Sequence, residues 1–130
     1  MSELSELYEQ GARCHQAAYA LAQCGSAAKD AALARIADVL LAEREQILQA
    51  NAQDIAAARA AGRSASFIDR LALDEQRIEG ICAGVREVMD LADPCGRVLE
   101  EWDRGELHFV KKSVPIGVIG IIFEARPNVC

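Results

Sequence analysis

The residues best suited to chemistry stand together near the end of the printed sequence: Glu124, Arg126 and Asn128. They follow the run 116–123, which is apolar apart from two glycines and is typical of a parallel strand buried on both faces. In open α/β sheets, ligands bind just beyond the carboxyl ends of such strands. The pattern therefore predicts that residues 124–128 meet a nucleotide or a substrate.

The same run has an alternative interpretation as an ordinary structural strand. Gly117 and Gly120 do not form a GxGxxG motif, and they lie inside the predicted strand rather than in a turn before a helix. Glycine in a strand is also typical of close packing against a neighbouring element. A strand buried on both faces needs strands beside it and helices over it, and residues 1–114 offer no obvious parallel partner. We therefore expect these 130 residues to be the opening part of a larger fold.

The elements before residue 93 are predicted to be helical, because every alanine except Ala125 precedes that point. A first helix is expected over about 3–23 and a second from Ser26. Asn51 is predicted to cap a third helix by accepting from the amide near Asp54, with a ligand contact as the alternative. A short helical turn begins at Ser64 or Ser66. The last helix is capped by Asp74 and has the clearest apolar stripe, made of Ile78, Ile81, Cys82, Val85, Val88 and Met89.

Two β-type runs, 97–102 and 107–114, predict a hairpin around the turn 103–106. Alternation places Val98 and Trp102 on one face, and Leu99 on the other. A two-stranded ribbon is marginal alone, so it needs packing or a partner. The acidic residues near the turn are expected to form a solvated surface.

Composition excludes several classes of function. A net charge of -6 argues against binding to a nucleic-acid backbone. No apolar run approaches the roughly 20 residues needed to cross a bilayer, and the acidic start does not look like a secretion signal, so we expect a cytoplasmic protein. The five cysteines include no CxxC pair, and neither His15 nor His108 stands in a cluster of ligands, so no metal site is predicted. Several of these thiols are expected to be reduced and buried.

The sequence resembles the N-terminal portion of the gamma-glutamyl phosphate reductase family (glutamate-5-semialdehyde dehydrogenases), in the aldehyde dehydrogenase superfamily. The resemblance is carried by 114–129 with its Glu-Ala-Arg-Pro-Asn run, and by Ala50–Asp54, Ala57–Gly62, Asp69–Leu71 and Asp93–Val98. It implies an incomplete α/β fold. Residues 1–96 would be a helical part packing on the cofactor domain, 97–114 a β-hairpin of the oligomerisation region, and 115–130 the first parallel strand and cleft loop of a Rossmann-type cofactor domain.

The resemblance also implies a reaction, the reduction of L-glutamyl 5-phosphate by NADPH to glutamate 5-semialdehyde in proline biosynthesis. In such chemistry a cysteine thiolate displaces phosphate to form a thioester, which hydride then reduces. By similarity, the cofactor and active-site cleft would be lined by Ile122, Phe123, Glu124, Ala125 and Arg126. Arg126 would bind the acyl phosphate or the substrate carboxylate, and Asn128 is a candidate substrate contact and oxyanion donor. The alternative for Arg126 is a structural ion pair with Glu124.

Two departures from the family pattern limit what the chain can do alone. None of its cysteines matches the family's nucleophile, and Cys130 stands where the family usually has threonine. Arg126 stands where many superfamily members have an asparagine. These 130 residues alone are therefore predicted to be inactive. For the full-length protein, the resemblance implies a cytoplasmic reductase that forms a homo-oligomer through the hairpin.

Two other functions stay open. The chain could be a free-standing helical interaction module without catalysis, or an aldehyde dehydrogenase with a different substrate. The run 116–123 argues against the first, because a module of that kind has no reason to end on an exposed apolar strand that favours aggregation.

Overall fold

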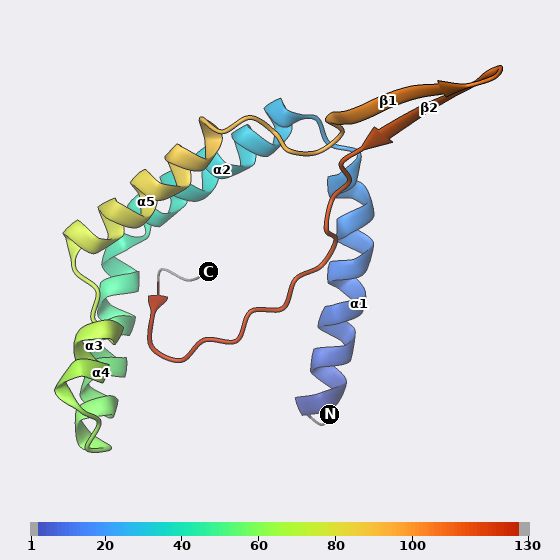
Figure 1. The fold of residues 1–130 in the computed structure, drawn as a ribbon. Helices are drawn as coiled ribbons and strands as arrows, with labels where there is room; N and C mark the ends of the chain where they lie inside the picture. Colours follow the sequence, from blue (N-terminus) through green and yellow to red (C-terminus); the bar gives the residue numbers. More distant parts are fainter. Residues whose placement is uncertain (1–2, 128–130) are drawn as a thin grey trace. The chain divides into compact units, whose positions relative to one another are not determined.

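The computed structural model describes residues 3–127. Within that range the elements are α1 (Glu3–Ala22), α2 (Ser26–Ala42), α3 (Arg44–Ala60), α4 (Ala65–Leu71), α5 (Glu75–Met89), β1 (Val98–Arg104) and β2 (Leu107–Lys112) (Figure 1). They fall into two compact units, 1–26 with 92–120, and 27–91 with 121–130. No helix in the described range is long and apolar enough to span a membrane.

The core of the second unit lies where α5 runs alongside α2 (Figure 1). Ala37 from α2 is fully buried against Ile78 and Cys82 of α5, and the Cys82 thiol lies 3.6 Å from the Ala37 carbonyl oxygen. This confirms the centre of the predicted stripe, although Val88 at its end is exposed. Leucines and isoleucines of α2 and α3 surround this cluster, so the core joins three helices.

The prediction that Asn51 caps a helix is wrong. Helix α2 ends just before Glu43 and α3 begins just after it. Asn51 therefore lies in the middle of α3, with 6% of its surface exposed. Its amide nitrogen donates to the Leu71 carbonyl at 2.9 Å, and its amide oxygen accepts from the Leu73 N–H at 2.8 Å. Asn51 thus holds the α4–α5 connection, a tertiary role that local spacing does not reveal.

The other predicted caps are confirmed. Ser64 rather than Ser66 caps α4, since its hydroxyl accepts from the Phe67 N–H at 3.2 Å. Asp74 caps α5 by accepting from the Arg77 N–H at 2.7 Å. These bonds satisfy amides that the first turn of a helix leaves without partners.

The first unit contains α1 and the β1–β2 ribbon. The helix α1 covers nearly all of the predicted range 3–23, and its apolar side chains Leu4, Leu7 and Leu21 are exposed. The start of α2 is tied to the chain before the ribbon, because the Ser26 hydroxyl donates to the Asp93 carboxylate at 3.0 Å.

The ribbon has the predicted antiparallel pairing, with Trp102 opposite Phe109 and their rings stacked at 5.5 Å between centroids. Its turn is Gly105-Glu106, where Gly105 has a φ of 61°, which glycine adopts without steric cost. A bulge between Val98 and Glu100 shifts the register, so Val98 pairs with Lys112. Because paired residues share a face, Val98 lies on the face opposite Trp102, and the predicted alternation is wrong there.

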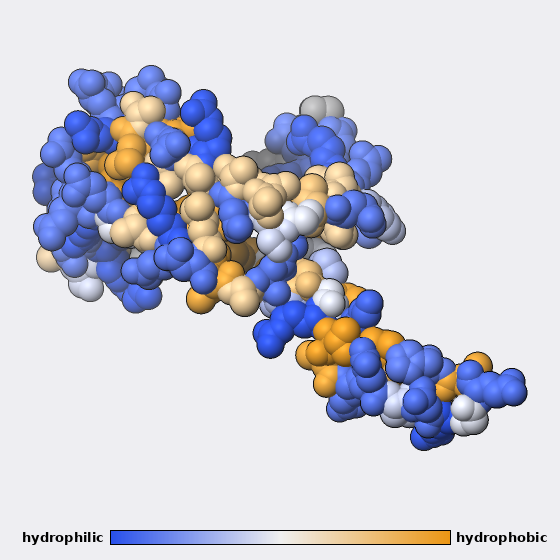
Figure 2. All heavy atoms as spheres, turned by 90° about the horizontal axis from the view of Figure 1, so that it is seen from above, coloured by the Kyte–Doolittle hydropathy of each residue, from blue (hydrophilic) through white to orange (hydrophobic). Residues whose placement is uncertain are grey.

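The predicted strand over 116–123 has no hydrogen-bonded neighbour among the described residues and no regular secondary structure. Its apolar side chains are exposed, and Ile122 is fully so. Figure 2 shows further apolar surface on the ribbon, beside hydrophilic side chains. A strand requires a partner for its backbone groups, and residues 3–115 supply none.

The expectation of several buried cysteines is only met at Cys82. Cys14 and Cys24 are exposed, and Cys95 is half-buried. Cys130 lies outside the described residues.

Candidate functional site

The α4–α5 corner of the second unit is held by several side-chain hydrogen bonds to its backbone. Besides the Asn51 bridge, the Arg77 guanidinium donates to the carbonyls of Asp69 and Ala72, at 2.5 and 2.7 Å, and pairs with the Asp69 carboxylate at 3.1 Å. The ion pair is partly solvent-exposed, so the Arg77 bonds to backbone carbonyls stabilise the corner more than the charge attraction between Arg77 and Asp69 does. The corner is therefore held from both sides, by α3 and by α5.

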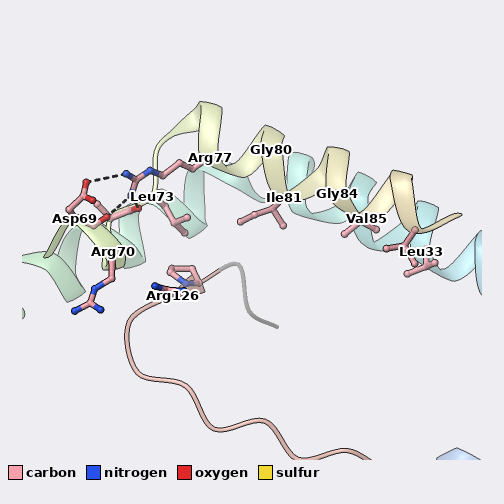
Figure 3. A pocket seen from close by; sticks show the side chains of 13 residues that line it. Leu33, Asp69, Arg70, Leu73, Arg77, Gly80, Ile81, Gly84, Val85 and Arg126 are labelled. Carbon is pink, nitrogen blue, oxygen red and sulfur yellow. Dashed lines mark hydrogen bonds and ion pairs between the residues drawn. The ribbon is translucent and has the colours of Figure 1, made fainter. Parts of the chain in front are cut away.

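A cavity of about 780 Å³ lies beside this corner (Figure 3). One wall is the α5 face that carries Gly80, Ile81, Gly84 and Val85, where the glycines leave open space. The remaining lining comes from α2, from the α4–α5 corner, and from Arg126 and Pro127. Most of this wall is apolar, and its charged groups gather at the α4 end.

A smaller notch of about 200 Å³ lies at that end and is built around the predicted site residues. Its lining is Arg70, Phe123, Glu124, Ala125 and Arg126. Ala125 is buried, whereas Phe123, Glu124 and Arg126 are exposed. In Figure 3 the side chains of Arg70 and Arg126 lie at the same end of the larger cavity.

The structure thus brings together four of the residues predicted from the sequence, Phe123 through Arg126. Ile122 lines neither cavity, and Asn128 lies outside the described residues. Glu124 and Arg126 line the same notch without forming the ion pair that was the structural alternative for Arg126.

Sequence reasoning missed Arg70 as a site residue. It stands far from Glu124 in the sequence and inside a helix of seven residues, and nothing in its spacing marks it. Its Nε donates to the Ser66 carbonyl at 3.2 Å, which helps to orient the guanidinium, and Arg70 lines the notch. Only the tertiary fold brings it beside the loop 123–126.

This arrangement, two guanidiniums and one carboxylate on an apolar backing, is suited to binding a small molecule that carries charges of both signs. We compared the chain with known proteins. No family model matches the sequence. A gamma-glutamyl phosphate reductase of Escherichia coli O7:K1 is 51% identical over 125 residues, covering 95% of this chain and 30% of the relative. That of Escherichia fergusonii is 50% identical over the same length.

Solved structures show the same likeness. The gamma-glutamyl phosphate reductase of Thermotoga maritima matches with a TM-score of 0.93 and 39% identity over 95% of this chain. That of Saccharomyces cerevisiae matches with a TM-score of 0.87 and 29% identity over 99% of it. The chain corresponds to an N-terminal portion of gamma-glutamyl phosphate reductase. It spans about 30% of the length of these reductases, and the notch residues 123–126 fall within that portion.

Proposed function

We propose that this chain forms the N-terminal part of a cytoplasmic, NADPH-dependent reductase that converts L-glutamyl 5-phosphate to glutamate 5-semialdehyde in proline biosynthesis. The observation that supports it most is the agreement in sequence and fold with reductases of that name over nearly the whole chain. The charged notch at 123–126 adds to this, because the substrate is itself a small charged molecule.

In this proposal the loop 122–126 lines the cofactor and substrate cleft. Its composition suits a phosphorylated nucleotide, since Ile122 and Phe123 offer exposed apolar contacts for ring faces and Arg126 offers a guanidinium for a phosphate or carboxylate. The bound cofactor would supply the hydride for the reduction. Asn128 would donate to the developing oxyanion.

The remaining parts would have supporting roles. Residues 1–96 would pack on the cofactor domain, and 115–130 would provide its first strand and cleft loop. The ribbon 97–114 would join subunits of a homo-oligomer, because Leu99, Trp102 and Phe109 leave apolar surface exposed on it. The nucleophilic cysteine would come from outside this chain, so the chain alone would not turn over substrate.

A chimaeric reductase tests the proposal. The matching N-terminal segment of the Escherichia coli reductase is replaced by this chain, and the product is assayed for growth of a proline auxotroph and for NADPH oxidation. We expect activity from the chimaera and none from the 130-residue chain alone. A folded chimaera without activity, or turnover by the chain alone, would contradict the proposal.

The role of Arg126 is tested in the same chimaera. Arg126→Lys keeps the positive charge but removes the bidentate N–H donors of the guanidinium, so we expect weaker binding of substrate or a lower rate. Arg35→Lys is the matched control, since Arg35 is an exposed arginine of α2 that lines neither cavity. Equal kinetics for both variants would remove Arg126 from the site.

A further inference from the structure

The notch is lined by charged groups of both signs. Arg70 reaches it from α4, and Glu124 and Arg126 reach it from the loop. The lining therefore carries two positive groups and one negative group within about 200 Å³. An α-amino acid carries the complementary set, a carboxylate and an ammonium on one carbon.

Within the described range, Glu124, Arg126 and the Nη groups of Arg70 have no hydrogen bond or ion pair, so they can contact a ligand. Asp69, next to Arg70, forms its ion pair with Arg77 at 3.1 Å. Arg70 donates to the Ser66 carbonyl through Nε only, and Arg126 has no hydrogen bond or ion pair within the described range. Two guanidiniums that share a notch repel one another, and a bound carboxylate would relieve that repulsion.

We propose that this notch binds the α-amino-acid end of the substrate, with Arg70 and Arg126 on the α-carboxylate and Glu124 on the α-ammonium. Guanidinium groups suit carboxylates because both are planar and can form paired hydrogen bonds. The proposal rests on the proposed function and deepens it. It makes Arg70 a substrate-binding residue, and it moves Glu124 and Arg126 to the amino-acid end of the cleft, away from the acyl phosphate.

The position of Arg70 is fixed by the corner behind it. Asn51 and Arg77 hold the last residue of α4 and the residue after it, and the Ser64 cap holds its start. A binding group on a short helix needs such support, because a helix of this length is not stable by itself. The notch would therefore discriminate between an amino acid and an analogue that lacks the ammonium, since the analogue would leave Glu124 without its partner.

The reverse reaction of the chimaeric reductase separates the two ends of the substrate. In that direction the enzyme takes glutamate 5-semialdehyde, inorganic phosphate and the oxidised cofactor, so each ligand has its own KM. For Arg70→Gln and Glu124→Gln we expect the KM for the semialdehyde to rise about tenfold or more, and the KM for phosphate to stay unchanged. Matched controls are Arg35→Gln and Glu79→Gln, which are exposed and line neither cavity.

A second substrate sharpens the test. The wild-type chimaera should prefer glutamate 5-semialdehyde to 5-oxopentanoate, which lacks the α-amino group, and Glu124→Gln should lose most of that preference. A rise in the KM for phosphate in Arg70→Gln would overturn the proposal and assign the notch to the phosphate. Equal rises in both KM values, or rises as large in the controls, would also overturn it. An inactive wild-type chimaera would instead contradict the proposed function.

Discussion

Removal of the Asn51 side chain should destabilise the chain far more than its place in the middle of a helix suggests. Asn51→Ala deletes two hydrogen bonds to the backbone of the α4–α5 connection, at 2.9 and 2.8 Å. The side chain has 6% of its surface exposed, so its removal also leaves space in the interior. Alanine favours a helix by its intrinsic preference, so a net loss of stability must come from the lost tertiary hydrogen bonds and packing.

The magnitude follows from those two bonds. Each hydrogen bond contributes about 0.5–1.5 kcal/mol net, and more when its partner is left unsatisfied away from water. Leu71 and Leu73 are half-buried, so water reaches their backbone groups only in part. We expect Asn51→Ala to lower the free energy of unfolding by about 2–3 kcal/mol. Asn51→Asp should be as damaging, because it keeps the acceptor for Leu73 but sets a carboxylate against the Leu71 carbonyl.

The assay is equilibrium unfolding in urea followed by helical circular dichroism, with Gln53→Ala as control. Gln53 is an exposed amide in the same helix and should change stability by no more than about 0.5 kcal/mol. At a slope of about 1–2 kcal/mol per molar urea, Asn51→Ala should lower the midpoint by about 1–3 M. Hydrogen exchange should show faster exchange at the Leu73 amide. Midpoints that agree between the two variants would refute the assignment of Asn51 as the clamp of this corner.

Five other substitutions test other parts of the structure. Arg77→Met removes two hydrogen bonds to backbone carbonyls, so it should lower the free energy of unfolding in urea by about 1–2 kcal/mol. Asp69→Asn removes only an exposed ion pair and should lower it by under about 1 kcal/mol. A larger loss for Asp69→Asn than for Arg77→Met would contradict the role given to the carbonyl bonds. Ile78→Ala in the core should lower the free energy of unfolding by about 2–4 kcal/mol. Val88 is half exposed, so Val88→Ala should lower it by under about 1 kcal/mol. Similar losses for the two variants would place the core elsewhere. Gly105→Ala forces a residue with a Cβ to a φ of 61° and should cost about 1–2 kcal/mol of ribbon stability, seen as loss of cross-strand contacts in NMR spectra; an unchanged ribbon would mean that the turn has another conformation.

Local rules predicted the helices and the ribbon well, because caps, apolar spacing and turn residues act over a few positions. Ser64 and Asp74 cap the helices expected of them. The role of Asn51 was mispredicted because its partners, Leu71 and Leu73, lie at and just beyond the end of the next helix, and no local pattern encodes such a pairing. The face of Val98 was misassigned because a bulge changes the period of alternation, and a bulge leaves no fixed signature in sequence.

The candidate site likewise contains residues that local patterns indicate and one that only the tertiary fold brings in. Glu124 and Arg126 were predicted as site residues because polar residues follow the apolar run 116–123 abruptly, and both line the notch, although their role stays a prediction. Arg70 could not be predicted, because it joins the notch only through the fold of α3, α4 and α5. The run 116–123 shows the complementary limit: its sequence is that of a strand, yet strand pairing depends on a neighbour that the described residues do not contain.

The site and the stability of the corner are therefore linked by one short helix. Helix α4 has seven residues, and isolated helices of that length are not stable in water. What holds it is the Ser64 cap at its start and the Asn51 bridge and Arg77 bonds after its end. The core cluster of Ala37, Ile78 and Cys82 contains none of the residues that make these bonds. A change at Asn51 should thus disorder the wall that carries Arg70 before it disturbs that core, so binding in the notch should fail while most of the helical structure persists.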